Sequence, residues 1–270
     1  MSYAVIGHPI GHSISPLIHT MLYEYYGMEE QYTSIDIPPE HLREIFEEKL
    51  CTLDGFNVTI PHKRSVFHLV DSVDEYAKRV GAVNTVKCDG RKTKGYNTDG
   101  DGFIRALKRY SGSAEGADVV IIGAGGAAVS VALKLSDEGA GSVTVLARDI
   151  AKAESICERL DCTSYAGTLD DYRPHGYDII VNATPVGMHP HEGESCVSLF
   201  QSGSIAYDLI YNPYTTAFLE KAAEQGAMPV NGLWMLIYQA FSAFEIWTGI
   251  CPDEEISLKI FEKAKEVLGL

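Results

Sequence analysis

Short apolar runs alternate with helical patterns over the first hundred residues. Residues 3–7 form an apolar run closed by glycine and proline, and Pro16 opens a series of apolar positions spaced as in a helix. The same criteria predict strands at 32–37, 55–60 and 82–87, a helix at 41–50 and a loop at 95–99. This alternation predicts an α/β layer structure with mainly parallel strands.

A second series of strands and helices follows residue 100. A helix is expected at 103–110 and a Gly/Ser-rich linker at 111–116. Further strands are expected at 118–122, 142–146, 179–182 and 205–208, with helices after Gly126, Ala151 and Thr215. The chain closes with an apolar stretch at 233–248 and a charged amphipathic helix at 253–268. We therefore predict a domain boundary near residue 100.

Length and charge narrow the class of protein. A chain of 270 residues exceeds the usual domain size of about 100 to 200 residues, which favours two domains. The formal net charge of −15, without a Lys/Arg-rich cluster, predicts no nucleic-acid partner and no anionic membrane partner. Gln239, Ser242 and Glu245 interrupt the apolar stretch, which falls short of the roughly 20 residues that span a bilayer, so a buried helix is expected.

The cysteines and the N-terminus predict a cytoplasmic protein. Six cysteines are scattered without a CxxC pair or a Cys/His spacing that suits zinc, which predicts reduced thiols and no metal site. Residues 1–10 lack the charged flank and the apolar core of a signal peptide.

The strongest local motif follows the apolar run at 119–122. It reads Gly-Ala-Gly-Gly-Ala-Ala at 123–128 and leads into a helical pattern. Gly123 permits a tight turn, Gly125 allows the backbone to approach a pyrophosphate, and Ala128 allows close packing of helix on strand. Gly-rich turns alone are common, but a second strand at 143–146 completes a βαβ unit and predicts dinucleotide binding.

The end of that second strand, where dinucleotide coenzymes are distinguished, carries opposite charges. The residues are Ala147, Arg148 and Asp149, with Lys152 one turn later. Arg148 suits an adenosine 2′-phosphate, whereas Asp149 suits a free 2′-hydroxyl and repels the phosphate. This pattern is compatible with NADP and with NAD, and also with two charged side chains that contact only solvent.

Three polar segments of the first domain occupy strand ends or the loops after them. They are residues 11–16 (Gly-His-Ser-Ile-Ser-Pro), 57–63 (Asn-Val-Thr-Ile-Pro-His-Lys) and 95–99 (Gly-Tyr-Asn-Thr-Asp). In open α/β sheets this edge is where ligands bind.

With these segments, the chain resembles the shikimate dehydrogenases, enzymes that interconvert 3-dehydroshikimate and shikimate with a nicotinamide coenzyme. The similarity covers nearly the whole length. Besides the segments above and the Gly123 motif, it includes residues 81–85, 182–188, 207–213 and 232–239.

The resemblance implies a substrate site and a proton-transfer group. Ser13 and Ser15 are expected to hydrogen-bond the substrate carboxylate, although a turn and an N-cap for the helix at Pro16 would also explain them. Lys63 is expected to give and accept the proton, with Asp99 positioning it. The remaining expected substrate contacts are Asn57, Thr59, Asn84, Tyr211 and Gln239.

The resemblance also implies the domain plan. We expect an α/β substrate-binding domain formed by residues 1–100 and 233–270, and a Rossmann-type doubly wound dinucleotide-binding domain at 101–232. The expected coenzyme contacts are Gly123, Ala124, Gly125, Gly126, Ala127, Arg148, Asp149, Thr184, Met188, Gly232 and Met235.

The coenzyme corner departs from the family, in which Asn-Arg-Thr or Asn-Arg-Ser is common. Arg148 and Lys152 favour NADP, while Asp149 keeps NAD possible. The leading interpretation is an NADP-dependent shikimate dehydrogenase of aromatic amino-acid and chorismate biosynthesis, a monomer or homodimer. The alternatives are a quinate/shikimate dehydrogenase and a non-catalytic dinucleotide-binding sensor, against which Lys63 and Asp99 argue.

Overall fold

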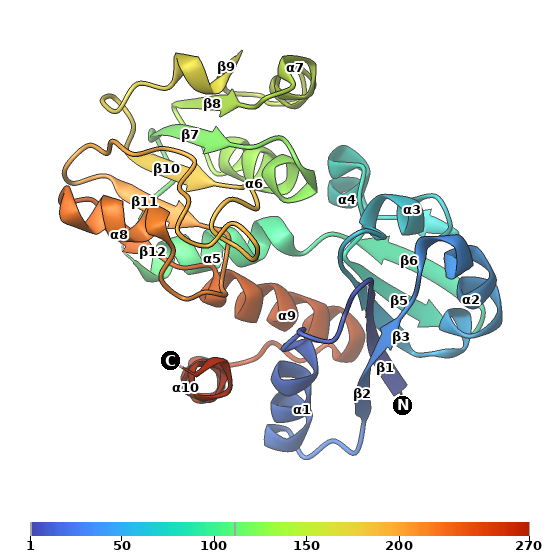
Figure 1. Ribbon diagram of the computed structural model, residues 1–270. Coiled ribbons are helices and arrows are strands. Elements are labelled where there is room, and N and C mark those ends of the chain that lie inside the picture. The colour runs from blue at the N-terminus through green and yellow to red at the C-terminus, as the bar shows by residue number, and fades with distance from the viewer. Residues whose placement is uncertain (1, 111, 270) are drawn as a thin grey trace. The chain divides into compact units, whose positions relative to one another are not determined.

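The computed structural model describes residues 2–110 and 112–269. Three residues lie outside the described ones: Met1, Ser111 and Leu270. They include the first residue of the expected linker and the outer ends of the expected substrate-binding domain. The chain divides into two compact units (Figure 1). The first unit combines Met1–Thr98 with Gln239–Leu270, and the second is Asp99–Tyr238.

A six-stranded mixed sheet forms the centre of the first unit, in the order β2-β1-β3-β5-β6-β4. β1, β2 and β3 are parallel to one another, whereas β5 is antiparallel to both β3 and β6. The strands are β1 (Ser2–Gly7), β2 (Gln31–Asp36), β3 (Gly55–Val58), β4 (Ser72–Val73), β5 (Thr85–Asp89) and β6 (Lys92–Tyr96). The helices are α1 (Ser15–Tyr25), α2 (Leu42–Glu48), α3 (Lys63–Phe67), α4 (Glu75–Val80) and α10 (Glu254–Leu268), while α9 (Leu233–Thr248) runs through the boundary of the two units.

Both faces of this sheet are covered. One face carries an apolar cluster that includes Ile6, Phe56 and Val86 and packs against α2. The other face carries stacked aromatic rings, with Tyr3 and Trp247 of α9 at 4.7 Å between centroids. Trp247 Nε1 donates to the Val86 carbonyl at 2.9 Å. A Cβ at Gly55 would lie 2.4 Å from that indole nitrogen, so the position requires glycine.

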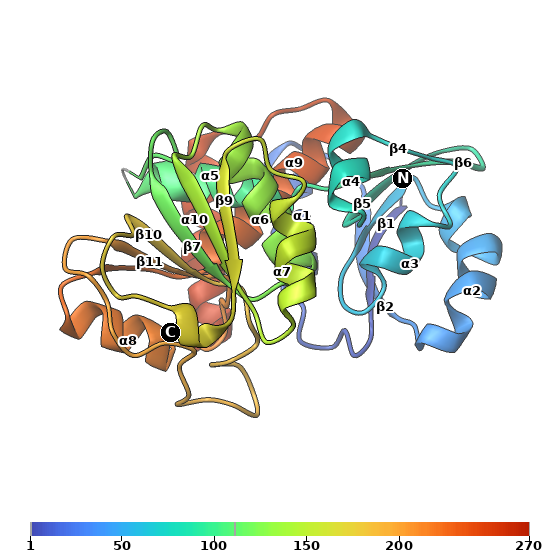
Figure 2. The same cartoon turned by 90° about the horizontal axis from the view of Figure 1, so that it is seen from above.

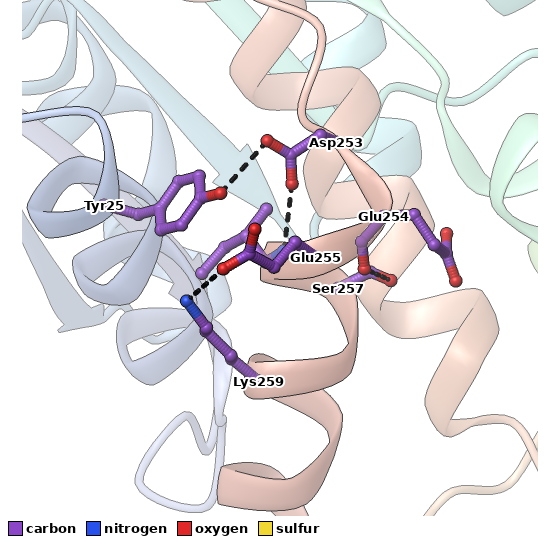
Figure 3. A network of polar contacts seen from close by, with 7 residues as sticks. Tyr25, Asp253, Glu254, Glu255, Ser257 and Lys259 are labelled. Carbon is purple, nitrogen blue, oxygen red and sulfur yellow. Dashed lines mark hydrogen bonds and ion pairs between the residues drawn. The ribbon is translucent and has the colours of Figure 1, made fainter.

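The C-terminal helix α10 packs on α1, and polar contacts fix its start (Figure 3). Asp253 caps the helix, because its Oδ1 accepts from the Ile256 N–H at 3.0 Å. The Tyr25 hydroxyl of α1 donates to Asp253 Oδ2 at 3.2 Å, and Lys259 donates to Glu255 at 2.6 Å one turn further on. These contacts join the end of the chain to its beginning within the first unit.

The second unit is a doubly wound parallel sheet (Figure 2). The strand order is β12-β11-β10-β7-β8-β9. From the central pair β7 and β10, the chain adds β8 and β9 on one side and β11 and β12 on the other, which is the Rossmann arrangement predicted from the sequence. The strands are β7 (Asp118–Ile122), β8 (Ser142–Leu146), β9 (Thr163–Gly167), β10 (Ile179–Asn182), β11 (Ile205–Asp208) and β12 (Met228–Val230). The helices are α5 (Asp99–Arg109), α6 (Gly126–Asp137), α7 (Ile150–Cys157) and α8 (Ala217–Glu224), with a 3-10 turn at Leu169–Asp171.

Some predicted boundaries were wrong. The segment 95–99 is not one loop, because β6 continues to Tyr96 and α5 begins at Asp99, where a carboxylate is favourable at a helix N-terminus. The helix expected at 41–50 is a 3-10 turn at Pro39–His41, α2, and a second 3-10 turn at Leu50–Thr52. Within the described part of the chain, no helix is long and apolar enough to cross a membrane.

Candidate active site

The loops after β1 and β3 lie at the same edge of the first sheet. The two strands are parallel neighbours with Ile6 opposite Val58, so they end together. The His8 N–H donates to the Ile60 carbonyl at 3.0 Å, and the Thr59 N–H donates to the Ile6 carbonyl at 2.9 Å. The chain segments that carry residues 11–16 and 57–63 therefore leave the sheet at the same carboxyl edge.

Ser13 and Ser15 lie at the entrance to α1. The Ser13 N–H closes a turn by donating to the Ile10 carbonyl at 3.0 Å. The N-cap of α1 is Ile14, whose apolar side chain offers no acceptor, and Ser15 is the first residue of the helix, so the expected turn is present but Ser15 is not the N-cap. Ser13 Oγ accepts from the Ser15 N–H, the first amide of α1, at 3.3 Å. Its own proton can then be donated to an anion, because a hydroxyl both accepts and donates.

Lys63 is the first residue of α3 and its side chain is partly buried. The preceding His62 is buried, with its Nε2 lying 2.7 Å from the Ile37 carbonyl oxygen. The Lys63 carbonyl accepts from the Val83 N–H at 2.9 Å. The side-chain contact of His62 and the backbone contact of Lys63 fix the start of α3, and with it the lysine, beside the segment that carries Asn84.

Asn57, Asn84 and Gln239 are all buried in the first unit. Asn84 Oδ1 accepts from the Thr98 N–H at 2.9 Å, and Asn84 Nδ2 donates to Thr98 Oγ1 at 2.9 Å. Asn84 Nδ2 also lies 3.5 Å from Gln239 Oε1 on α9. The apolar helix α9 thus brings one amide to the carboxyl edge, next to a second amide from the start of β5.

Asp99 and Tyr211 belong to the second unit. Asp99 is buried and begins α5 directly after Thr98. Tyr211 follows β11 and is partly buried, and this burial raises the pKa of its hydroxyl above the usual value.

The Gly-rich turn after β7 has the shape that a pyrophosphate needs. Gly123 has φ +113°, and a Cβ there would lie 2.7 Å from the Ala183 carbonyl oxygen. A Cβ at Gly125 or Gly126 would meet no atom within 4 Å, so the space at the start of α6 is open. The first amides of a helix have no acceptor within it and can bind phosphate oxygens. The turn therefore fits a dinucleotide.

A pocket of about 650 Å³ opens at this turn, among the ends of β7, β8 and β10. Of the predicted coenzyme residues it is lined by Gly123, Ala124, Gly125, Arg148, Asp149 and Thr184. Its lining does not include Gly126, Ala127, Met188, Gly232 and Met235. The loop after β10 also lines it, with Ala183, Pro185 and Val186 of the segment 182–188, and with four residues that the sequence did not single out: His191, Glu194, Ser195 and Cys196.

The charges at the coenzyme corner are paired. Asp149 Oδ2 lies 3.5 Å from Lys152 Nζ, and both side chains are more than half exposed, at 54% and 67%. Arg148 is also exposed and faces the same pocket. Lys152 thus neutralises part of the carboxylate charge that would oppose a 2′-phosphate.

A buried carboxyl group supports the loops at this edge. Asp208, at the end of β11, accepts from Asn182 Nδ2 and the Ile210 N–H, both at 3.0 Å, and from the Thr216 hydroxyl at 2.6 Å. Asn182 Oδ1 in turn accepts from the Thr184 N–H at 3.0 Å and so shapes the pocket wall. Burial raises the pKa of Asp208 from 3.8 to about 6, although these hydrogen bonds oppose the shift.

We expect Asp208 to make the stability of the protein depend on pH. Because its folded-state pKa is raised, its stabilising contribution is complete below pH 3.8 and is lost as the pH rises to about 6. The difference corresponds to about 3 kcal/mol. Asp208→Asn, whose amide can still accept from Asn182 and Ile210 and donate to Thr216, should not show this loss. Urea unfolding of both proteins at several pH values tests this, and a stability difference that stays constant with pH would contradict it.

No group of three or more His, Cys, Asp or Glu side chains is arranged to hold a metal ion among residues 2–110 and 112–269.

Family models and relatives agree on one enzyme family. The model for the shikimate dehydrogenase substrate binding domain matches residues 5–86, and the model for shikimate / quinate 5-dehydrogenase matches residues 105–190. The model for the shikimate 5′-dehydrogenase C-terminal domain matches residues 232–256. The shikimate dehydrogenase (NADP(+)) of Methanothermobacter thermautotrophicus is 38% identical over 262 residues, which cover 93% of this chain and 92% of that protein. The chain belongs to the shikimate dehydrogenase family.

Solved structures of the shikimate dehydrogenase family share the fold over nearly the whole chain. A shikimate dehydrogenase crystallised in complex with NADP+ has a TM-score of 0.90 and 37% identity, covering 97% of this chain and 95% of that one. The Thermus thermophilus enzyme, in complex with NADP(H) and shikimate, has a TM-score of 0.89 and 34% identity, with coverage of 98% and 99%. The predicted fold class and the resemblance are therefore confirmed.

Proposed function

We propose that the protein is an NADP-dependent shikimate dehydrogenase that reversibly reduces 3-dehydroshikimate to shikimate in chorismate and aromatic amino-acid biosynthesis. The observation that carries this proposal is the similarity to such enzymes along nearly the full length of the chain. The open cradle at Gly125 and the polar carboxyl edge of the first sheet are in accord with it.

The substrate offers a carboxylate and several hydroxyl groups, which call for different partners. Ser13 and Ser15 are proposed to donate to the carboxylate. Asn57, Thr59, Asn84, Tyr211 and Gln239 are proposed to line the rest of the site, where amide and hydroxyl groups can both donate to and accept from substrate hydroxyls.

Reduction of the ketone produces an alkoxide, which needs a proton. The bound coenzyme supplies the hydride. We propose that Lys63 gives the proton in reduction and takes it in oxidation, and that Asp99 positions Lys63 and the reacting hydroxyl. A cation at the developing alkoxide also stabilises the negative charge.

Steady-state kinetics with shikimate and with quinate, each with NADP and with NAD, test the proposal directly. We expect the highest kcat/KM for shikimate with NADP. Preferred oxidation of quinate would favour the quinate/shikimate alternative. A protein that binds NADP but oxidises neither substrate would favour a non-catalytic sensor.

The proposed carboxylate site predicts the behaviour of a double variant. Replacing Ser13 and Ser15 together by Ala should raise the KM for shikimate more than it lowers kcat, because two hydrogen bonds to a charged group are lost, worth about 1.5 to 3 kcal/mol each at most. Ser72→Ala, at an exposed serine of β4, is the matched control. Normal shikimate binding by the double variant would show that the carboxylate binds elsewhere.

The coenzyme corner predicts two opposite effects on selectivity. Arg148→Ala should weaken NADP much more than NAD, because only NADP carries the 2′-phosphate. Asp149→Thr should lower the KM for NADP relative to NAD, because it removes the repulsive charge and frees Lys152 from the ion pair. KM values for both coenzymes, with the exposed Arg159→Ala as control, measure this. Equal losses for both coenzymes in Arg148→Ala would assign Arg148 to the shared adenosine or to the fold.

Other features of the protein stay predictions. They are the domain limits 1–100 with 233–270 and 101–232, a monomeric or homodimeric state, and a cytoplasmic location. The last is in accord with six cysteines that carry free thiols, since disulfides are rare in the cytosol.

A further inference from the structure

A chain of buried hydrogen bonds leads from β2 to the amide of Asn84. The Tyr32 hydroxyl donates to Asn57 Oδ1 at 2.6 Å, Asn57 Nδ2 donates to Thr85 Oγ1 at 3.0 Å, and the Thr85 hydroxyl donates to Asn84 Oδ1 at 3.0 Å. All four side chains are buried, with Thr85 at 0% and Tyr32 at 7% exposure.

Backbone groups at two points fix the direction of every bond in this chain. Asn57 Nδ2 lies 3.2 Å from the Asn84 carbonyl oxygen, which can only accept, so the Asn57 amide cannot be reversed. Asn84 Oδ1 lies 2.9 Å from the Thr98 N–H, which can only donate, so the Asn84 amide cannot be reversed either. The Thr85 hydroxyl must therefore accept from Asn57 and donate to Asn84, and the Tyr32 hydroxyl must donate.

The fold holds both hydroxyl groups in place. Asn57 and Thr85 are directly paired residues of the antiparallel strands β3 and β5. The Tyr32 ring stacks on His19 of α1, with centroids 4.3 Å apart and planes 10° apart. Burial lowers the pKa of His19 to about 3, with the Asn57 side chain opposing the shift, so the stacked imidazole is neutral. Little freedom is left for Tyr32 to turn its hydroxyl away from Asn57.

We propose that Tyr32 and Thr85 are positioning residues for substrate binding, which hold the Asn84 amide in the orientation that its proposed substrate contact needs. The Asn84 oxygen accepts from Thr85 and from the Thr98 N–H, and the Asn84 nitrogen donates to Thr98 Oγ1 at 2.9 Å. The distance of 3.5 Å from Asn84 Nδ2 to Gln239 Oε1 is long for a hydrogen bond. Loss of the Thr85 hydroxyl would remove one of the contacts that hold the Asn84 amide beside Gln239. This inference rests on the proposed function.

Two substitutions remove one link each. Tyr32→Phe and Thr85→Val should each raise the KM for shikimate by about three- to tenfold, which corresponds to one hydrogen bond. The kcat should change by less than about twofold, since the chain would support the bound substrate and the transition state alike. The KM for NADP should not change, because the dinucleotide pocket is lined by residues of the second unit.

Matched variants separate positioning from packing. Tyr23→Phe removes another buried tyrosine hydroxyl of the same aromatic cluster, one that has no hydrogen-bond partner in the described part of the chain, and should leave the KM for shikimate unchanged. Thr85→Ser keeps the hydroxyl and should restore a KM close to that of the wild type. If Tyr32→Phe does not fold, the KM values of Thr85→Val and Thr85→Ser for shikimate decide between positioning and packing.

Three results would overturn the inference. One is a KM for shikimate within twofold of the wild type in Tyr32→Phe and Thr85→Val, with the enzyme active. Another is an equal rise in Tyr23→Phe or in Thr85→Ser, which would assign the effect to packing. A wild-type protein that does not oxidise shikimate would overturn the proposed function and this inference with it, and is distinguished from the first two by the wild-type assay alone.

Discussion

Lys63→Ala is expected to lower kcat for shikimate oxidation by about a hundredfold or more, with a small effect on the KM. The reason is that general acid–base catalysis by a positioned group contributes about a hundredfold or more, while binding of the carboxylate and the other hydroxyls does not need the lysine. Lys63 begins α3, whose start is fixed by the Val83 N–H, so its loss should leave the local backbone intact. Steady-state kinetics at saturating shikimate measure the effect.

The neighbouring Arg64 supplies the control for this experiment. Arg64 is exposed on the same helix, so Arg64→Ala removes a charge of the same sign without reaching the proposed reacting groups. It should retain nearly normal kcat. If Lys63→Ala also retained nearly normal kcat, Lys63 would not be the proton-transfer group.

The coenzyme-binding fold could be predicted from the sequence because its signals are local. The turn at Gly123 and Gly125, the strand before it and the helix after it are contiguous, and each glycine has a local steric cause. The position of Arg148 beside the coenzyme site could also be predicted, because Arg148 follows the second strand of the same βαβ unit. The loop with His191 and Glu194, which lines the same pocket, carries no such motif, since its position depends on the path of the chain after β10.

The support of the substrate site could not be predicted, because its partners are far apart in the sequence. Tyr32 and Asn57 meet only because β1 lies between their strands and places both on one face of the sheet. Thr85 faces Asn57 through an antiparallel pairing of β3 and β5 that no pattern in the sequence predicts. The short elements α3 and β4 were missed for a related reason, since one or two turns or two residues give no readable periodicity.

Errors at the ends of helices came from residues that occupy positions other than the ones they usually favour. Ser15 looked like an N-cap because serine before an apolar pattern is a typical cap, yet Ile14 holds that position and Ser15 begins the helix. Gly100 and Gly102 hid the start of α5, because glycine is unfavourable inside helices, and the helix was expected only from residue 103.

Asp99→Asn is expected to lower kcat by about tenfold or more and also to raise the KM for shikimate several-fold. Both effects follow if the carboxylate positions Lys63 and accepts from a substrate hydroxyl, because the amide keeps the shape but loses the charge and one acceptor. Asp99 is buried at the first turn of α5, so the variant also loses a favourable charge at a helix N-terminus, and its unfolding should be measured alongside.

Asp101→Asn separates the chemical effect from the effect on the helix. Asp101 lies in the same first turn, but it is 46% exposed and pairs with Lys134 of α6 at 2.7 Å. Its substitution should lower stability slightly and leave kcat and KM nearly unchanged. A loss of stability in both variants with normal kinetics in both would show that Asp99 serves the fold. Impaired kinetics in Asp99→Asn alone would support its role beside Lys63, since both variants lose a negative charge at the same end of the same helix.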